Sequence, residues 1–182
     1  MMYELFILGE LSDGPMHGYL LHQILLNVLG PMRTVSWGTL YPVLQKLEQE
    51  GLIALAEESS GPQSGRPKKV YAITDRGREQ FLRLMERPLE HNAETEDIFR
   101  IKLSKFHLMP AKLCQTILSQ YKAWLDLVLD ALAMTRARVE QEMHIADQER
   151  PDILQAIDYE TTAYMARLEW VENALLREET RQ

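Results

Sequence analysis

Cysteine is nearly absent from this chain of 182 residues, which contains only Cys114. A single cysteine excludes an intrachain disulfide framework of the kind that stabilises small secreted domains. Cys114 lies in the helical pattern KLCQTIL, so we expect a small packed or half-exposed side chain. A redox sensor is the alternative for this residue.

Long hydrophobic runs are also missing. No stretch approaches the roughly 18 apolar residues of a membrane span, and Glu4 lies where a secretory signal would carry positive charge. These absences favour a cytoplasmic protein with no membrane association. Because 46% of the residues are apolar, the chain is long enough to bury a core in one or two domains.

The motifs of common enzyme classes are missing as well, including the glycine-rich phosphate loop, the nucleophile elbow and paired metal motifs. The acidic residues at positions 94–97, near His91, lie on an expected linker and first helical turn, where acids favour the helix dipole. His17 and His22 would lie about 140° apart around a helix, with no further ligands at suitable spacing. We therefore predict no enzyme, no catalytic residues, no metal site and no cofactor.

The charge of the chain is unevenly distributed. The net charge of −7 argues against bulk attraction to nucleic acid. Residues 1–87 hold nine Lys and Arg against ten Asp and Glu, whereas residues 88–182 hold eleven against seventeen. The first part is thus nearly neutral, with its positive charge clustered, and the second part is acidic.

The central functional element is predicted at residues 34–53, which read TVSWGTLYPVLQKLEQEGLI and indicate a short amphipathic helix. On a helical wheel, one side suits a core and the other a partner. The apolar side holds Leu40, Val43, Leu44, Leu47 and, at its margin, Trp37. The polar side holds Gly38, Thr39, Pro42, Gln45, Lys46 and Gln49. We interpret this element as a DNA-reading helix.

The start of this helix has two alternatives, because Ser36 and Thr39 are both acceptable N-caps. With Thr39 as the cap, Pro42 falls in the first turn, where its missing N–H costs no hydrogen bond. With Ser36 as the cap, the carbonyl of Gly38 loses its partner and the helix should bend. We expect an irregular first turn and a regular helix to about Glu50, ended by the following glycine.

The flanking segments predict the rest of an N-terminal domain. Helical spacing indicates helices at residues 2–11 and 16–29, and alternation indicates strands at 52–58 and 68–74. A further helix at 76–87 would begin after the capping pair Thr-Asp. The order helix, helix, helix, strand, strand, helix is that of a winged helix-turn-helix, which places its second paired helix in the major groove.

The hairpin tip between the two strands carries the densest positive patch of the first half, formed by Arg66, Lys68 and Lys69. A basic wing beside a DNA-reading helix can reach phosphates or the neighbouring groove. An ordinary solvated hairpin is the alternative.

Residues 88–182 predict a second, all-helical domain that is poor in glycine. A short helix is expected at 95–106, and Pro110 and Pro151 each open a long helix, the first running to about residue 146. The two long helices form an antiparallel hairpin whose remaining apolar surface is best covered by a second copy of the chain. Packing against residues 95–106 is the alternative. The predicted dimerisation residues are Tyr164, Leu168, Val171 and Leu175.

Aromatic residues of the second domain offer a further choice. They could line a pocket for a planar molecule, or they could belong to the core, as aromatic stripes at helical spacing usually do. These residues are Tyr121, Trp124, Tyr159, Tyr164 and Trp170.

Three segments together resemble the PadR family of bacterial transcriptional regulators. They are GPMHGY at 14–19, GTLYPVLQKLEQEGLI at 38–53 and RPKKVYAITDRGREQF at 66–81, in which glycine, aromatic, proline and wing positions agree in order and spacing. The second half is similar in pattern and length to the branch with a long C-terminal dimerisation domain. That branch includes phenolic-acid-responsive repressors and a virulence-gene activator.

The resemblance implies a homodimer that binds an inverted-repeat operator of double-stranded DNA. Such a protein usually represses a nearby promoter and releases DNA when an effector, here a small aromatic molecule, binds. An activator of the same fold and a protein-binding adaptor are the alternatives. The family pattern and the wheel together assign phosphate or base contacts to Ser36, Trp37, Thr39, Tyr41 and Gln45. They assign phosphate charge to Lys46, Arg66, Lys68 and Lys69.

Overall fold

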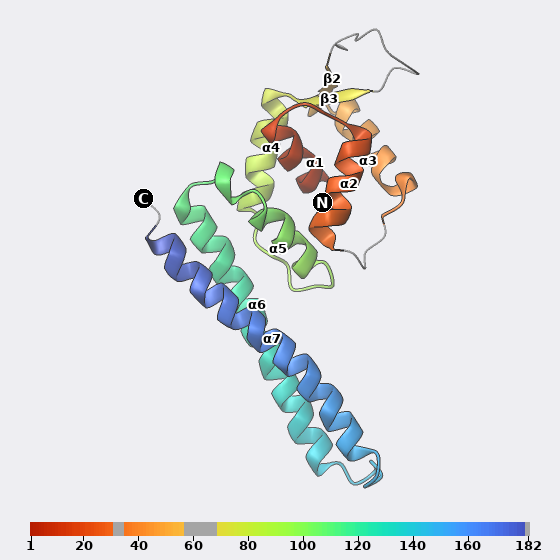
Figure 1. The fold of residues 1–182 in the computed structure, drawn as a ribbon, viewed down its shortest axis with the longest axis vertical. Coiled ribbons are helices and arrows are strands. Elements are labelled where there is room, and N and C mark those ends of the chain that lie inside the picture. Colours follow the sequence, from red (N-terminus) through yellow and green to blue (C-terminus); the bar gives the residue numbers. More distant parts are fainter. Residues whose placement is uncertain (31–34, 57–68, 181–182) are drawn as a thin grey trace. The chain divides into compact units, whose positions relative to one another are not determined.

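The computed structural model describes residues 1–30, 35–56 and 69–180. The chain forms two compact units, Met1–Leu108 and Met109–Gln182 (Figure 1). The first is a helical unit with a three-stranded sheet, and the second is a pair of long helices. The predicted fold class is confirmed: mainly α, a winged helix-turn-helix followed by an all-helical part. The first unit extends beyond residue 87, where we expected the domain boundary.

Helix α1 (Met2–Asp13) lies at the centre of the first unit, in contact with α2, α3, α4, α5 and β3. Leu5, Phe6, Ile7 and Leu8 follow one another in the sequence, and all four side chains are buried. A helix that is apolar around its whole circumference must be covered on every side. The remaining elements of the unit supply that cover.

Helix α2 (Gly18–Leu29) begins two residues later than expected, because Met16–His17 form a short strand, β1. Met16 pairs with Tyr71 and His17 with Val70 in antiparallel register. His17 has an extended backbone and is the N-cap of α2. The prediction that the helix starts at Met16 was therefore wrong, since this segment gains sheet hydrogen bonds that its local helical spacing does not reveal.

Helix α3 (Trp37–Gln49) is the expected DNA-reading helix, with Ser36 as its N-cap. Pro42 therefore lies inside the helix, and its lack of an N–H deprives the carbonyl of Gly38 of the usual i+4 donor. Gly51 follows the helix with φ of 70°, a left-handed conformation that favours glycine. The predicted glycine stop is confirmed.

Strands β2 (Ile53–Leu55) and β3 (Val70–Ile73) form the base of the wing, with Ala54 opposite Ala72. They are shorter than the predicted strands, and the tip of the hairpin lies outside the described residues. Strand β3 lies in the middle of the sheet, between β1 and β2.

Helix α4 (Asp75–Glu86) is capped by Thr74, whose hydroxyl accepts a hydrogen bond of 3.1 Å from the amide of Gly77. A Cβ at position 77 would lie 2.0 Å from the carbonyl oxygen of Leu52. Only glycine permits this approach, which holds α4 against the start of the wing.

Helix α5 (Thr95–Leu103) directs two cations to the C-terminal ends of other helices. The Arg100 guanidinium donates to the carbonyl of Leu29, the last residue of α2, over 3.1 Å. The Lys102 ammonium donates to the carbonyl of Met85, near the end of α4, over 2.9 Å, and to that of Arg87. Cations at these positions satisfy free carbonyls and oppose the negative end of the helix dipole.

A third cation, Lys105, lies between α5 and the 3₁₀ helix η1 (Phe106–Leu108). Its ammonium is 2.8 Å from carboxylate oxygens of both Glu10 and Asp13, at the end of α1. Lys105 and Glu10 are buried, so this pair has to satisfy its own hydrogen bonds. We refer to Arg100, Lys102 and Lys105 together as the cation clamp.

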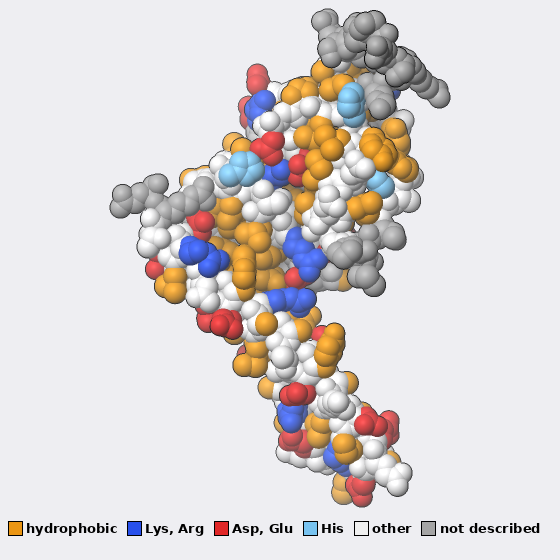
Figure 2. Space-filling model, viewed as in Figure 1, with side chains coloured by type: hydrophobic (Ala, Val, Ile, Leu, Met, Phe, Trp, Pro, Cys, Tyr) orange, Lys and Arg blue, Asp and Glu red, His pale blue; other side chains and the backbone are white. Residues whose placement is uncertain are grey.

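The second unit consists of α6 (Ala111–Gln141) and α7 (Arg150–Glu179), which lie side by side (Figure 1). Helix α6 ends five residues before the predicted residue 146. The Arg150 guanidinium donates to the carbonyls of Val139, Glu142 and Ile145. These hydrogen bonds stabilise the loop that follows α6, so the helix does not continue to residue 146. Hydrophobic, acidic and basic side chains are interspersed along the surface of this hairpin (Figure 2).

The cation clamp generates a prediction about stability and pH. Burial, and then the charge of Arg87, lower the pKa of Lys102 from 10.5 to about 8. Between these values the unfolded chain binds more protons than the folded chain, so the contribution of Lys102 to the free energy of unfolding rises with pH. Between pH 7.5 and 10, the free energy of unfolding of wild type should rise by about 2–3 kcal/mol relative to that of Lys102→Met, measured by urea unfolding.

Lys102→Arg is the control for this measurement, because a guanidinium keeps its charge over the whole range. The free energy of unfolding of wild type should show the same rise with pH relative to Lys102→Arg. Parallel stability curves for wild type and both variants would show that the Lys102 ammonium does not titrate in this window.

Candidate nucleic-acid interface

The inner side of α3 is fixed by three leucines, Leu40, Leu44 and Leu47, which are all fully buried. Burial of these side chains at helical spacing determines which residues face outward. Ser36, Tyr41, Gln45 and Lys46 are exposed, as are Gly38, Pro42 and Gln49, whereas Thr39 and Trp37 are half-buried. The predicted amphipathic division of this helix is confirmed.

The N-terminal end of α3 carries two hydroxyl groups that contact each other. The Oγ of Ser36 lies 3.1 Å from the Oγ1 of Thr39, and the Ser36 side chain makes no capping hydrogen bond to the helix. Both hydroxyls can donate and accept, so they could exchange this mutual hydrogen bond for contacts to a phosphate or a base edge.

Lys46 forms an ion pair with Glu50 one turn further along, with a separation of 3.7 Å between nitrogen and oxygen. Both side chains are exposed, and exposed pairs of this kind contribute little to stability. The Lys46 ammonium can therefore turn to a phosphate at low cost.

Trp37 connects α3 to α2 through stacked rings. Its indole is 4.2 Å from the ring of His22 and 5.9 Å from that of Tyr19, with interplanar angles of 20° and 18°. The ring of Tyr41, one turn further along α3, lies 5.5 Å from the Trp37 ring at an angle of 39°. Contacts of this kind add stability beyond the buried area. Trp37 thus has a structural role whether or not it also touches DNA.

His22 adds a hydrogen bond to this aromatic cluster. Its Nε2 donates to the carbonyl of Val35 over 2.6 Å, which ties α2 to the residue just before the α3 cap. From the sequence we predicted no metal site at His22 and assigned it no other role. No local spacing could have predicted the pairing of His22 on α2 with Trp37 on α3.

The basic wing is described only at its base. Lys69 is exposed and immediately precedes β3, in the same unit as α3. Arg66 and Lys68 lie outside the described residues, so their predicted phosphate contacts remain predictions.

The predicted dimerisation residues lie on α7 with different degrees of exposure. Tyr164, Leu168 and Leu175 are half-buried, whereas Val171 has no exposed surface in the single chain. Val171 could affect an interface only through the packing of the hairpin. Several large apolar side chains in this unit are more exposed: Leu127, Met134, Tyr159, Met165, Trp170 and Leu176.

Three of the five aromatic residues of the second unit form a cluster. The Tyr121 and Trp124 rings stack at 5.6 Å, and Trp124 meets Tyr164 edge to face at 6.0 Å. Tyr159 is largely exposed, and the Arg177 guanidinium lies 5.9 Å from the Trp170 ring. A planar effector that stacks on aromatic rings would therefore have the cluster of Tyr121, Trp124 and Tyr164 as its candidate site.

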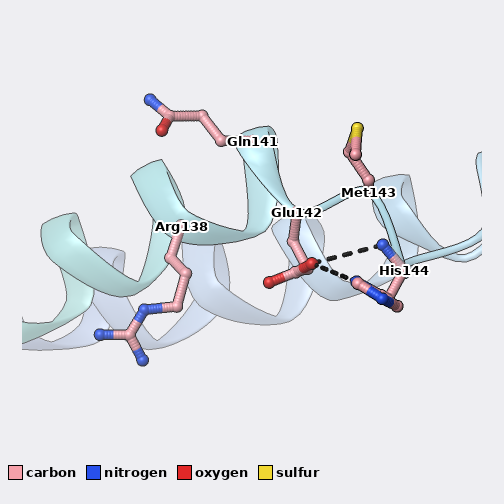
Figure 3. A pocket seen from close by; sticks show the side chains of 5 residues that line it. All are labelled: Arg138, Gln141, Glu142, Met143 and His144. Atoms are coloured by element: carbon pink, nitrogen blue, oxygen red, sulfur yellow. Dashed lines mark hydrogen bonds and ion pairs between the residues drawn. The ribbon is translucent and has the colours of Figure 1, made fainter.

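A hollow lies at the turn that follows α6, lined by Arg138, Gln141, Glu142, Met143 and His144 (Figure 3). The Glu142 carboxylate accepts hydrogen bonds from the amide and the Nδ1 of His144, and these bonds lower its pKa. The Arg138 guanidinium points away from this pair (Figure 3). The hollow has no converging set of polar groups that would mark a binding site.

The described residues offer little evidence for a metal site, a membrane-spanning helix or a reactive cysteine. Among residues 1–30, 35–56 and 69–180, no cluster of three or more His, Cys, Asp or Glu side chains could hold a metal ion. Within the same residues, no helix is both long and apolar enough to cross a bilayer. Cys114 is fully buried. Glu96, from the acidic stretch near His91, pairs with Arg100 at 3.4 Å.

A helix-turn-helix followed by a two-stranded wing places the first unit in the winged-helix class. Residues 7–83 match the Transcriptional regulator PadR-like family. The chain is 30% identical over 157 residues to the transcriptional regulator YqjI of Escherichia coli (strain K12), with 84% of this chain and 69% of the relative covered. The chain therefore belongs to the PadR-like family of transcriptional regulators, as the motifs predicted.

The chain is also similar to solved structures. One is Bacillus subtilis PadR in complex with operator DNA, at 20% identity and a TM-score of 0.46, with 98% of this chain and 99% of the other covered. Another is the Vibrio cholerae virulence activator AphA, at 18% identity and a TM-score of 0.41, with 100% of both chains covered.

Proposed function

We propose that this regulator is a homodimer that represses transcription by binding an inverted-repeat operator and that releases DNA when a small aromatic effector binds. The observation that carries the proposal is the outward face of α3, which is polar and exposed in the same unit as the exposed Lys69 at the base of the wing. Three buried leucines hold this face outward. Polar side chains on such a helix can hydrogen-bond base edges in the major groove, while the wing and Lys46 supply phosphate contacts.

A dimer would present two α3 helices related by a twofold axis. Operator half-sites should then lie about 10 base pairs apart, or a multiple of that spacing. The second unit supports this arrangement, because its exposed large apolar side chains favour contact with a second copy of the same surface. We propose Tyr164, Leu168 and Leu175 for this interface, together with the more exposed Tyr159 and Met165.

The alternatives differ in what the same surfaces would bind. An activator would use the same operator contacts as a repressor. A protein-binding adaptor would need an apolar docking surface on α3, whereas that face is dominated by polar groups and proline. The basic residues at the wing also favour a polyanion over a protein.

The proposal is tested by selecting duplexes from a random pool with the purified protein and weighing the complex by light scattering. We expect enrichment of an inverted repeat and a free-protein mass of twice the 21.1 kDa of one chain. Failure to enrich any sequence would contradict sequence-specific binding. Enrichment of a single half-site by a 21.1 kDa species would contradict the dimer.

The wing should contribute charge without sequence information. Lys68→Ala combined with Lys69→Ala should weaken binding to every duplex. It should also lower the slope of log affinity against log salt by up to about two counterion units per subunit. Fluorescence anisotropy between 50 and 200 mM salt measures this slope. Arg76→Ala, on the first turn of α4, is a control for the loss of a positive charge elsewhere in the unit. An unchanged slope in the double variant would remove the wing from the interface.

Gln45 should contribute sequence information, because an amide side chain can pair with adenine through two hydrogen bonds. Gln45→Ala should change the preferred base at one position of each half-site, with discrimination there reduced by about 1–3 kcal/mol. A repeated selection with this variant measures the change. An equal loss on every operator variant would show that Gln45 only positions the protein.

A further inference from the structure

Gly38 differs from the helical glycines Gly9 and Gly77, because the packing of its own fold gives no reason for the missing side chain. A Cβ at position 77 would clash with a carbonyl at 2.0 Å, and one at position 9 would lie 3.2 Å from Lys105 and Phe81. A Cβ on Gly38 would meet only the Oγ of Ser36, at an ordinary 3.5 Å. Its backbone also lies outside the left-handed region that favours glycine.

The position of Gly38 on α3 is the second observation. Gly38 is exposed, whereas the helical glycines Gly9, Gly18 and Gly77 are buried. Residues 38, 42, 45 and 49 recur at intervals of four, three and four, so they form one stripe along the outermost side of the helix. The stripe contains Gly38, Pro42, Gln45 and Gln49.

The backbone of Gly38 is also unusually available. Pro42 has no N–H, so it cannot donate to the carbonyl of Gly38 as the fourth residue of a regular helix would. The end of α3 at Gly38 therefore combines a bare Cα with a carbonyl that lacks its usual helical partner. Glycine in a helix is unfavourable relative to alanine, so the fold alone would be served better by a side chain here.

We propose that Gly38 is the point at which the backbone of α3 approaches the floor of the DNA major groove most closely, and that the absence of a Cβ there is required for specific binding. This inference rests on the proposed DNA-binding function. A methyl group at the closest point of approach would move the helix outward, and hydrogen bonds from Gln45 to base edges would lengthen. Phosphate contacts from flexible lysine side chains would adjust to the same displacement.

The inference predicts opposite effects on stability and on binding. Gly38→Ala should leave the midpoint of thermal unfolding unchanged or raise it by a few degrees. It should weaken binding to the duplex selected by wild type at least tenfold, and Gly38→Leu should abolish that specific binding. Binding to poly(dI-dC), which depends on phosphate charge, should stay within about threefold of wild type.

Gly18→Ala is the matched control, because a Cβ there would lie 3.6 Å or more from its neighbours, in ordinary contact, and Gly18 is buried away from the surface. This variant should bind both DNAs like wild type. Failure of wild type to bind the selected duplex would count against the proposed function. If wild type binds, the role of Gly38 would be overturned by unchanged binding of Gly38→Ala to the selected duplex. An equal loss of affinity of this variant for the selected duplex and for poly(dI-dC) would overturn it too. So would a fall of more than about 5 °C in the unfolding midpoint of Gly38→Ala.

Discussion

The cation clamp is the interaction on which the first unit depends. Arg100, Lys102 and Lys105 come from one short segment, yet they reach the C-terminal ends of α2, α4 and α1 respectively. Arg100 and Lys105 compensate the negative charge at the ends of α2 and α1. Lys102 holds the end of α4 by hydrogen bonds to carbonyls, although burial disfavours its charge and lowers its pKa. A single segment thereby fixes three helices that surround the same apolar core. This explains why α5 belongs to the winged-helix unit, although its sequence resembles the start of the helical second half.

The cation clamp and the stacked rings around Trp37 together position α3, because the clamp fixes α2 and the rings join α2 to α3. Arg100 fixes the end of α2, and stacking of His22 on Trp37 fixes the beginning of α3. On the inner side, buried leucines fix the rotation of the helix about its axis. The side chains on the outer face of α3 therefore contribute little to the packing of the unit. Contacts on the inner face of the helix set their positions. Such preorganisation lowers the cost of ordering the surface when a partner binds.

The sequence predicted those elements that local patterns determine. Helical spacing, the Thr74 cap and the stop at Gly51 placed α3 and α4 to within a few residues. Contacts between distant segments were not predictable in this way. The strand at Met16–His17 exists because β3 lies beside it, and Arg100, Lys102 and Lys105 have no periodicity that points to three different helix ends. The role of Trp37 depended on a partner in another helix, which a wheel of one helix cannot show.

The distribution of charge determines what kind of DNA binding this chain can support. Within α3 the outward side chains are uncharged apart from Lys46, and Lys46 is already paired with Glu50. The positive charge that α3 offers for non-specific binding is therefore small, and the exposed Lys69 before β3 adds to it. In the function that we propose, discrimination between DNA sequences comes from close contacts of α3 with base edges, which require a backbone that can approach them.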